Sequence, residues 1–220
     1  MPESEWLTWQ IVDSAFPTGA FAHSCGLESA WQQGEVEDLD ALERFLHASI
    51  LQAGHAALPL LNSAHRDPER LAVLDELCDV FLVNAVANRA SRIQGRSLVA
   101  TAARIWPSDA IAGVRTRTRT TCAHVAPVSG AVFRALGLPL ETAQKVALFG
   151  AARAVLTAAV RLGIAGSYEA QRMQYASAGW LEEVAERCGP LTADDLAQTA
   201  PVIDILQGGH DRLYSRLFQS

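Results

Sequence analysis

Residues 139–163, PLETAQKVALFGAARAVLTAAVRLG, have the spacing of a long amphipathic helix. Pro139 suits its first turn, because the fixed φ of proline is already helical and its missing N–H needs no partner there. Small and apolar side chains then recur at steps of three and four along one face: Phe149, Ala152, Leu156, Ala159 and Gly163. Arg153, Thr157 and Arg161 fall on the flank and back of this helix. The stretch therefore predicts one helix that runs through Arg161.

The same spacing recurs along the chain and predicts an all-α fold. Apolar periodicity, acidic first turns and Gly or Pro at the ends predict further helices over 5–14, 27–33, 39–53, 68–85 and 167–188. We expect Gly54 to end the third of these, and Thr192-x-x-Asp195 to cap a short helix. Residues 115–121, RTRTRTT, alternate without an apolar face, so we interpret them as a mobile loop rather than a strand. No repeat or long linker interrupts the chain, which predicts a single compact helical domain over 1–220.

Composition limits the classes of function. The formal net charge is −6 and the isoelectric point is near 5.5, which argues against a general nucleic-acid binder because such a protein needs a basic surface. The four cysteines, at 25, 78, 122 and 188, have no zinc-site spacing and indicate a reducing compartment. Residues 1–5, MPESE, lack the features of a signal peptide, and no apolar run approaches the ~18–20 residues that span a membrane. We therefore expect a cytoplasmic protein that does not cross a membrane.

Residues 16–28, FPTGAFAHSCGLE, form an unusual connector between two predicted helices. Pro17 fixes its own φ and favours an extended Phe16, while Gly19 and Gly26 permit positive φ at the two ends of the run. An ordinary turn is short and polar, whereas this one carries aromatic, His and Cys side chains that are costly to leave without a contact. The composition therefore indicates a segment that needs something to pack against.

This connector resembles the opening signature of the UreF family of urease accessory proteins, in the variant F-P-T-G-x-F-A-H-S-x-G-L-E, and we treat residues 1–34 as the signature segment. Commoner members of that family have Tyr at the position of His23 and Gln at the position of Cys25. Later segments are also similar. Residues 91–98 match S-R-x-Q-G-R-x-L, residues 158–166 match A-A-V-[RK]-L-x-x-x-G, and the chain ends, like UreF proteins, in R-L-F-x-S. The resemblance therefore covers nearly the whole chain.

The resemblance implies an all-α, dimeric, cytoplasmic chaperone for urease maturation. Such a protein binds the accessory protein UreD (also called UreH), recruits the GTPase UreG, and helps the assembled complex to deliver nickel to apo-urease. It is not expected to be an enzyme or to hold a cofactor of its own, although nickel passes through the complex. The expected partner-binding residues come from the matching segments: Pro17, Gly19, His23, Ser24, Gly26, Glu28, Arg92, Gln94, Gly95, Arg96, Arg161, Arg212, Leu213, Tyr214, Arg216, Leu217 and Phe218.

The second matching segment interrupts an apolar pattern. If the helix that starts after Pro68 continued at ~100° per residue, Arg92 and Arg96 would fall on the line that should face the core. Either Gly95 breaks the helix and resets its phase, or the segment forms a polar patch. A buried Arg must be paired, so an internal Arg–carboxylate network and a partner-facing patch are both open. Arg161 is likewise either a solvated charge at a helix end or part of a binding surface.

The end of the chain, residues 208–220, has the features of a partner-binding tail. Gly208-Gly209 uncouples it from the preceding helix and predicts flexibility. In a helical tail the apolar residues would form neighbouring rows beside Arg212 and Arg216, Leu213 with Leu217 and Tyr214 with Phe218. Exposed aromatic residues next to Arg are typical of interfaces. We expect the tail to bind a partner and its removal to leave the fold intact; the alternative is a tail folded back onto its own domain.

His23, Ser24 and Cys25 leave a second class of function open. His23-x-Cys25 supplies two ligand types suited to Ni, Zn or Cu, and a stable site would need further ligands from His47, His55, His65, His124 or His210. No GxSxG, HExxH, GxGxxG or Walker A motif is present. We therefore expect His23 to be hydrogen-bonded to the loop backbone and Cys25 to act as a small apolar residue, with a transient metal contact left open. The alternative function is a small metal- or thiol-dependent enzyme centred on these three residues, and a plain helical scaffold is a third.

Overall fold

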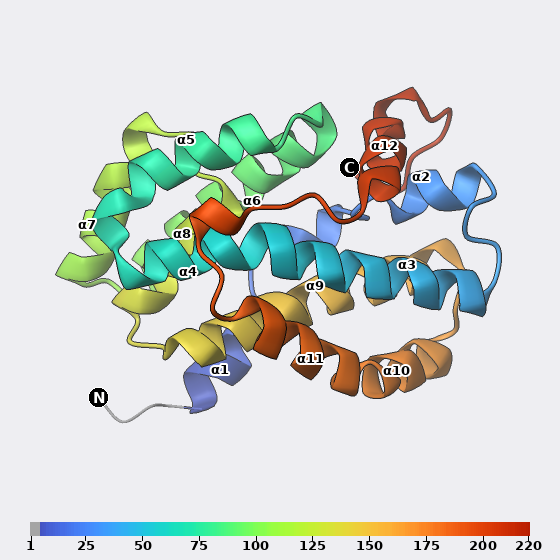
Figure 1. Cartoon of the computed structure of the whole chain (residues 1–220), viewed down its shortest axis with the longest axis horizontal. Helices are drawn as coiled ribbons and strands as arrows, with labels where there is room; N and C mark the ends of the chain where they lie inside the picture. The colour runs from blue at the N-terminus through green and yellow to red at the C-terminus, as the bar shows by residue number, and fades with distance from the viewer. Residues whose placement is uncertain (1–4) are drawn as a thin grey trace.

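Helices form all the regular secondary structure in the computed structural model, which describes residues 5–220 (Figure 1). The α-helices are α1 (Glu5–Val12), α2 (Leu27–Gln32), α3 (Leu39–Gln52), α4 (Leu58–Arg66), α5 (Leu71–Phe81), α6 (Ala85–Ile105), α7 (Asp109–Arg117), α8 (Val125–Ala135), α9 (Leu140–Leu162), α10 (Ser167–Ala176), α11 (Ala178–Cys188) and α12 (Pro201–Gly208). Short 3-10 helices span Ala20–Ala22, Pro68–Arg70, Thr118–Thr120, Ala193–Asp195 and His210–Arg212, and a π-helical turn spans Ala53–Ala57. The all-α prediction is confirmed for these residues. Residues 1–4, part of the argument against a signal peptide, lie outside the described residues, and the assignment of 1–220 to one domain stays a prediction.

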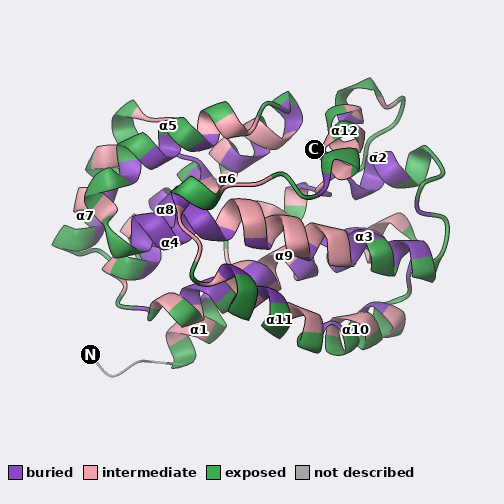
Figure 2. Ribbon diagram, viewed as in Figure 1, coloured by how far each residue is buried: buried purple, intermediate pink, exposed green. Residues whose placement is uncertain are grey.

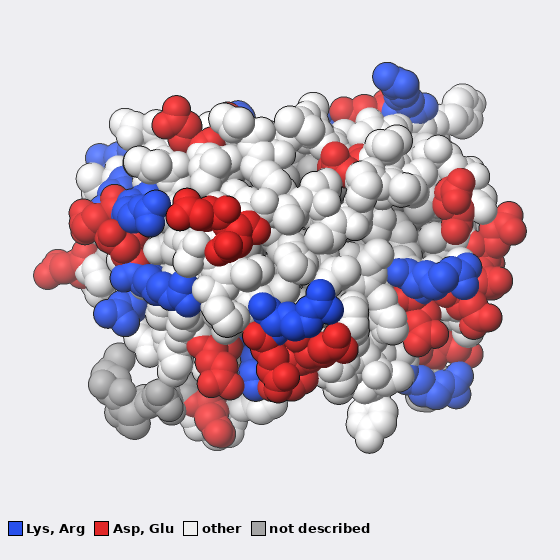
Figure 3. All heavy atoms as spheres, in the orientation of Figure 1, with Lys and Arg blue, Asp and Glu red and all other residues white. Residues whose placement is uncertain are grey.

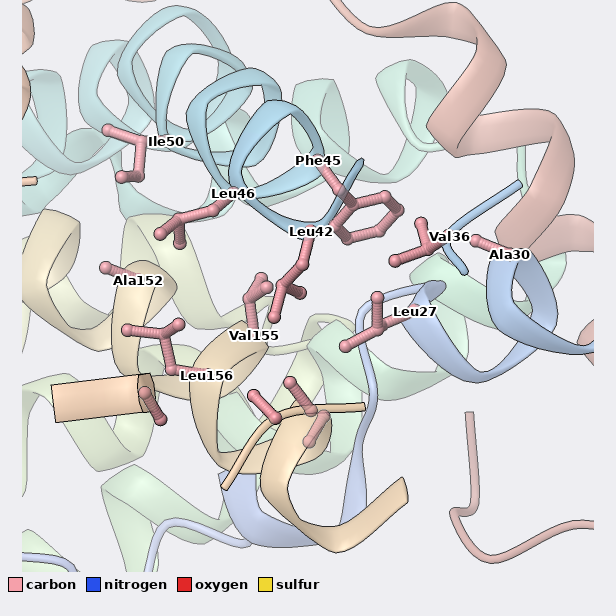
Figure 4. Packing of buried hydrophobic residues seen from close by; sticks show 14 of the residues in the cluster. Leu27, Ala30, Val36, Leu42, Phe45, Leu46, Ile50, Ala152, Val155 and Leu156 are labelled. Carbon is pink, nitrogen blue, oxygen red and sulfur yellow. The ribbon is translucent and has the colours of Figure 1, made fainter. Parts of the chain in front are cut away.

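α9 connects the two largest apolar clusters of the molecule. Pro139 is its N-cap, one residue before the predicted position, and Gly163 ends it with a φ of 76°, which suits a residue without a side chain. Val155 lies in the cluster that α9 forms with α2 and α3, where Figure 4 shows it close to Leu42. Ala143, at the start of α9, lies in the second cluster, with residues of α1, α6, α7 and α8. One helix therefore contributes to both halves of the core.

α4 lies at the centre of the fold. Its residues from Leu58 to His65 are all buried, which Figure 2 shows as a continuous purple stretch beside α8. Leu58 belongs to the first cluster, Leu61 to the second, and Leu60 to a third that includes residues of α5. A helix that is buried on every side packs against several neighbours at once, and α4 therefore joins all three clusters.

Gly54 does not end the preceding helix as predicted. α3 continues through the π-helical turn Ala53–Ala57 directly into α4. Gly54 is required there by space, because a Cβ atom on this residue would lie only 2.5 Å from Cγ1 of Val184 and 2.9 Å from Sγ of Cys188. The glycine therefore lets α11 approach the α3–α4 junction, and it does not stop the helix.

The predicted helix from Pro68 to Ala85 is broken by the residues between α5 and α6. Asn84 is the N-cap of α6, and its Oδ1 accepts a hydrogen bond from the N–H of Val86 at 2.9 Å. The helical phase is therefore reset at Asn84 and not at Gly95, which lies inside α6.

Two other boundaries differ from the predictions. Residues 115–121 are not a loop, because α7 runs to Arg117 and a 3-10 turn follows, with the Thr118 hydroxyl bonded to the carbonyl oxygen of Val114 at 3.2 Å. Buried Ile111 and Val114, upstream of the polar run, supply the apolar face of this helix. The helix predicted over 167–188 is divided at Ser177 into α10 and α11. The capping arrangement of Thr192 with Asp195 is present, on a single 3-10 turn.

Charged side chains are spread over the surface. On the face shown in Figure 3, blue and red residues lie side by side and form no continuous basic area among the residues described. No helix within residues 5–220 has both the length and the apolar character that a bilayer crossing requires.

Candidate functional site

The connector at residues 16–28 is held against α6 and α12. The carbonyl oxygen of Pro17 accepts hydrogen bonds from the hydroxyls of Ser97 (2.9 Å) and Thr101 (3.0 Å) on α6. Gly19 and Gly26 have φ values of 77° and 88°, so the prediction of positive φ at both is confirmed. A Cβ atom on Gly26 would lie 3.0 Å from Cβ of Gln207, which shows how closely α12 approaches this turn.

The tail folds back onto this connector. Gly209 has a φ of −75° and continues the helical conformation, and after the 3-10 turn His210–Arg212 the chain is not helical. The apolar rows that a helical tail would form are therefore absent: Phe218 is buried, whereas Tyr214 is fully exposed. The flexibility of the tail stays a prediction, and Arg89 of α6 holds its first turn through two hydrogen bonds to Asp211, at 2.8 and 3.2 Å.

Glu28, in the first turn of α2, is the main anchor of the tail. The residue is 1% exposed, and its carboxylate accepts three hydrogen bonds, from Nε2 of His210 (2.9 Å), the N–H of Leu217 (2.5 Å) and the N–H of Phe218 (3.2 Å). A buried carboxylate is costly unless its oxygens are paired. A non-helical tail satisfies this need, because backbone N–H groups that a helix would use internally point instead at Glu28.

His23 and Ser24 bind the last residue of the chain. Nδ1 of His23 lies 2.5 Å from the hydroxyl of Ser220, and Ser24 donates its N–H (2.6 Å) and its hydroxyl (3.1 Å) to the main-chain oxygen of Ser220. Burial lowers the pKa of His23, so the imidazole is neutral near pH 7. His23 is hydrogen-bonded, but its partner is the side chain of Ser220 in the tail and not the loop backbone that the sequence led us to expect.

Arg161 of α9 contacts both the connector and the tail. Its guanidinium lies between the rings of Phe21, at 4.0 Å from the centroid, and Phe218, at 4.1 Å. It also donates a hydrogen bond to the carbonyl oxygen of Phe21 at 2.5 Å. A cation between two aromatic faces is attracted by both, so Arg161 is held within the molecule and is not merely a solvated helix-end charge. Its part in partner binding stays a prediction. We call residues 16–28, residues 210–220 and Arg161 the signature–tail junction.

The segment around Arg92 lies outside this junction. Arg92 forms an ion pair with Asp79 of α5, which also accepts hydrogen bonds from Asn88 (2.8 Å) and Nε2 of His124 (3.1 Å). The hydrogen bonds from Asn88, Arg92 and His124 hold the pKa of Asp79 well below its usual range. For Arg92 the structure thus contains the internal Arg–carboxylate network. Arg96, by contrast, is exposed and forms no ion pair within residues 5–220.

Gly95 and Gln94 have different neighbours. A Cβ atom on Gly95 would lie 2.0 Å from the carbonyl oxygen of Ala123, so only glycine lets the backbone of residues 122–124 approach α6 this closely. Gln94 lines a mostly apolar cavity of about 210 Å³ together with His23 and Cys25.

The surroundings of His23, Ser24 and Cys25 do not favour a nucleophilic role for the thiol or the hydroxyl. Burial raises the pKa of the Cys25 thiol to about 11, so it is protonated at neutral pH. The hydroxyl of Ser24 is already bonded to Ser220. Within residues 5–220, the one group of three side chains that could hold a metal ion lies elsewhere, at Asp79, Cys122 and His124.

Sequence reasoning missed several residues of the junction. Phe21 and Ser220 matched the signature but were given no role, and His210 was considered only as a metal ligand. Their partners lie far away in the chain, so no local pattern joins them. One available signal was Glu28, a carboxylate next to apolar residues of α2. Once buried, it needs hydrogen-bond donors from elsewhere in the chain.

Comparison with known proteins agrees with these features. A model of the UreF family matches residues 36–178. Urease accessory protein F of Arabidopsis thaliana is 37% identical over 222 residues, covering 98% of this chain and 92% of that protein. An uncharacterized UreF-like urease accessory protein of Schizosaccharomyces pombe and UreF of Arthrobacter sp. (strain FB24) are each 30% identical over 96% of this chain. The chain therefore belongs to the UreF family of urease accessory proteins.

Proposed function

We propose that this protein acts in urease maturation as a dimeric scaffold, with no catalytic step of its own. In this proposal it binds a UreD (UreH) type partner and recruits the GTPase UreG in the cytoplasm. Nickel is the cargo of the assembled complex and its destination is apo-urease. Membership of the UreF family supports the role in urease maturation, and the geometry of the signature–tail junction supports the role as a scaffold.

The observation that carries the proposal is the set of apolar side chains that the junction holds toward solvent. Phe21 is 64% exposed, Leu217 is 53% exposed and Tyr214 is fully exposed, although their neighbours His23 and Phe218 are buried. Where hydrogen bonds such as that from the N–H of Leu217 to Glu28 hold the backbone, aromatic and leucine side chains lose little conformational entropy when a partner covers them. The exposed Arg212 and Arg216 add charge at the rim of this surface.

The competing enzyme function has less support. A thiol with a pKa of about 11 is a poor nucleophile at neutral pH, and Nδ1 of His23 is directed to Ser220 and not to Cys25. These residues serve instead to hold the tail. A transient metal contact at His23 and Cys25 remains compatible with the proposal, because both line the same small cavity.

Exposed residues of the tail test the partner-binding surface. We expect the double variant Tyr214→Ala/Leu217→Ala to lose at least tenfold in affinity for the UreD-type partner, measured by calorimetry, because interface aromatics dominate binding energy. Its melting temperature should not change, since both side chains are exposed. Tyr175→Ala on α10 is the matched control, because Tyr175 is also exposed and lies away from the junction. Unchanged affinity of the double variant would contradict the proposal.

Arg96 tests whether the GTPase binds at the groove between α5 and α6. It lines an open groove of about 720 Å³ between α5 and α6, beside Val80 and Val83. We expect Arg96→Glu to reduce recovery of UreG in a pull-down with the preformed UreD-type complex. Arg104→Glu, an exposed arginine on the same helix, should leave recovery unchanged. Equal recovery with both variants would exclude this groove.

A further inference from the structure

A cluster of metal-ligating side chains lies where α5 passes the segment that leads into α8. Asp79, Cys122 and His124 place a carboxylate oxygen, a thiol sulfur and a ring nitrogen within 4.8 Å of one another. This cluster is separate from the signature–tail junction, and among its members only Asp79 also lines the groove that contains Arg96.

The backbone that carries two of these side chains is fixed by a buried carboxylate. Asp75, one helical turn before Asp79, accepts hydrogen bonds from the N–H groups of Cys122 (2.7 Å), Ala123 (3.1 Å) and His124 (2.5 Å). Ala123 has a φ of 60°, which a residue with a side chain rarely adopts. Three successive N–H groups on one carboxylate hold this conformation, so Cys122 and His124 are presented in a fixed arrangement.

The imidazole of His124 is oriented like that of a metal ligand. It is fully buried, with Nδ1 3.0 Å from the hydroxyl of Ser91 and Nε2 3.1 Å from Oδ1 of Asp79. The Ser91 hydroxyl is itself fixed, because it accepts a hydrogen bond from the N–H of Val125 at 3.2 Å. In metal sites a second group typically binds the ring nitrogen that does not face the ion, and Ser91 is placed to do so.

We propose that Asp79, Cys122 and His124 bind one divalent transition ion of the zinc class, with water as a further ligand. Sulfur and imidazole ligands disfavour Mg²⁺ and Ca²⁺ and suit Zn²⁺ or its neighbours. When the ion binds, the thiol of Cys122 releases its proton to solvent, so that a carboxylate and a thiolate together balance the charge of the divalent ion. Arg92 pairs with Asp79 in the absence of the ion and is displaced when the ion binds.

The surface around the cluster gives the ion a path of entry. Asp79 and Arg92 both line the open groove between α5 and α6. The Arg92 side chain is 35% exposed, so it can turn into this groove and leave the carboxylate free. This site does not depend on the role in urease maturation, and it is distinct from the His23 and Cys25 pair.

Cobalt spectroscopy of the full-length protein tests the site. Chelator-treated protein is titrated with Co²⁺ and then with Zn²⁺, and we expect one ion per chain and a thiolate-to-cobalt charge-transfer band that Zn²⁺ abolishes. Cys122→Ser should remove the band and weaken Zn²⁺ binding at least tenfold, whereas Cys25→Ser should change neither. Arg92→Met should strengthen Zn²⁺ binding, because it removes the competing cation. Absence of the band in the natural protein, or its loss only in Cys25→Ser, would overturn the proposal.

Alkylation of the natural protein gives a second measurement that needs no variant. Zn²⁺ should slow the reaction of Cys122 with iodoacetamide at least fivefold, as followed by mass spectrometry of the peptide that contains it. The buried Cys188 should stay unmodified with and without Zn²⁺, which checks that the protein remains folded during the reaction. Equal rates at Cys122 with and without Zn²⁺ would overturn the proposal even if Cys122→Ser failed to fold.

Discussion

The carboxylate of Glu28 holds the tail through hydrogen bonds from three of its residues. Glu28→Gln keeps the shape of the side chain but replaces one carboxylate oxygen by an NH₂ group, which faces donors among His210, Leu217 and Phe218. Hydrogen bonds to charged groups contribute about 1.5–3 kcal/mol each, so we expect the free energy of unfolding to fall by about 2–3 kcal/mol in urea denaturation. Glu35→Gln, the same change at an exposed position, should cost less than ~0.5 kcal/mol. Equal losses in the two variants would show that Glu28 does not anchor the tail.

The lowered pKa of His23 predicts that the stability of the protein depends on pH. Burial, together with the charges of Arg89 and His210, lowers its pKa from 6.5, so below this pH the unfolded chain takes up a proton that the folded chain resists. The free energy of unfolding should therefore decrease as the pH falls from 7.5 to 5.5. His65, whose pKa burial also lowers, contributes in the same direction. His23→Asn keeps an acceptor or donor for Ser220 and should make the decrease shallower, whereas an unchanged slope would contradict this role.

Gly95 determines how closely α6 packs against the segment that leads into α8. Gly95→Ala would place a methyl group 2.0 Å from the carbonyl oxygen of Ala123, so backbone must move. We expect thermal and urea unfolding to show a loss of about 2–3 kcal/mol. Gly150→Ala, inside α9 with nothing within 4 Å of the added Cβ, should instead stabilise by ~0.5–1 kcal/mol. Stabilisation by both substitutions would mean that α6 has room at Gly95.

The sequence predicted several of the helix boundaries that neighbouring residues determine and missed those that depend on contacts between distant elements. Apolar periodicity, an acidic first turn and Pro139 predicted the start of α3 and α9 from Pro139 through Arg161, because these signals involve neighbouring residues. The break at Asn84 had a local signal, an N-cap side chain, but the apolar stripe continued across it and outweighed the cap. No local signal marked the role of Gly54, because the close neighbour that requires a glycine there is Val184 on α11, far along the chain.

The candidate site was predicted in its parts but not in its assembly. Its segments matched the UreF signature, yet nothing in the sequence pairs Glu28 with His210 or places Arg161 between two phenylalanine rings. These contacts join the two ends of the chain and depend on how α2, α9 and α12 pack. The sequence could therefore indicate which residues matter, whereas the reason that each is needed required the whole molecule.

Deletion of residues 212–220 tests the junction at the scale of the whole molecule. The sequence alone suggested that the fold would be unaffected, but Phe218 and Ser220 are buried and the deletion removes both. We therefore expect the truncated protein to remain helical and to lose at least about 3 kcal/mol in the free energy of unfolding, as for removal of a buried aromatic side chain. A truncated protein with an unchanged urea midpoint would show that the tail is not part of the fold.

Combining this deletion with Glu28→Gln separates the anchor from general packing. In the truncated chain Glu28 has lost the N–H groups of Leu217 and Phe218, so the second change removes less. The loss measured for the combined variant should be smaller than the sum of the two separate losses by at least ~1 kcal/mol, because residues that share hydrogen bonds are not additive. The same cycle with Glu35→Gln should be additive. Additivity at Glu28 would mean that its carboxylate stabilises α2 independently of the tail, and that burial of Phe218 alone holds the end of the chain in place.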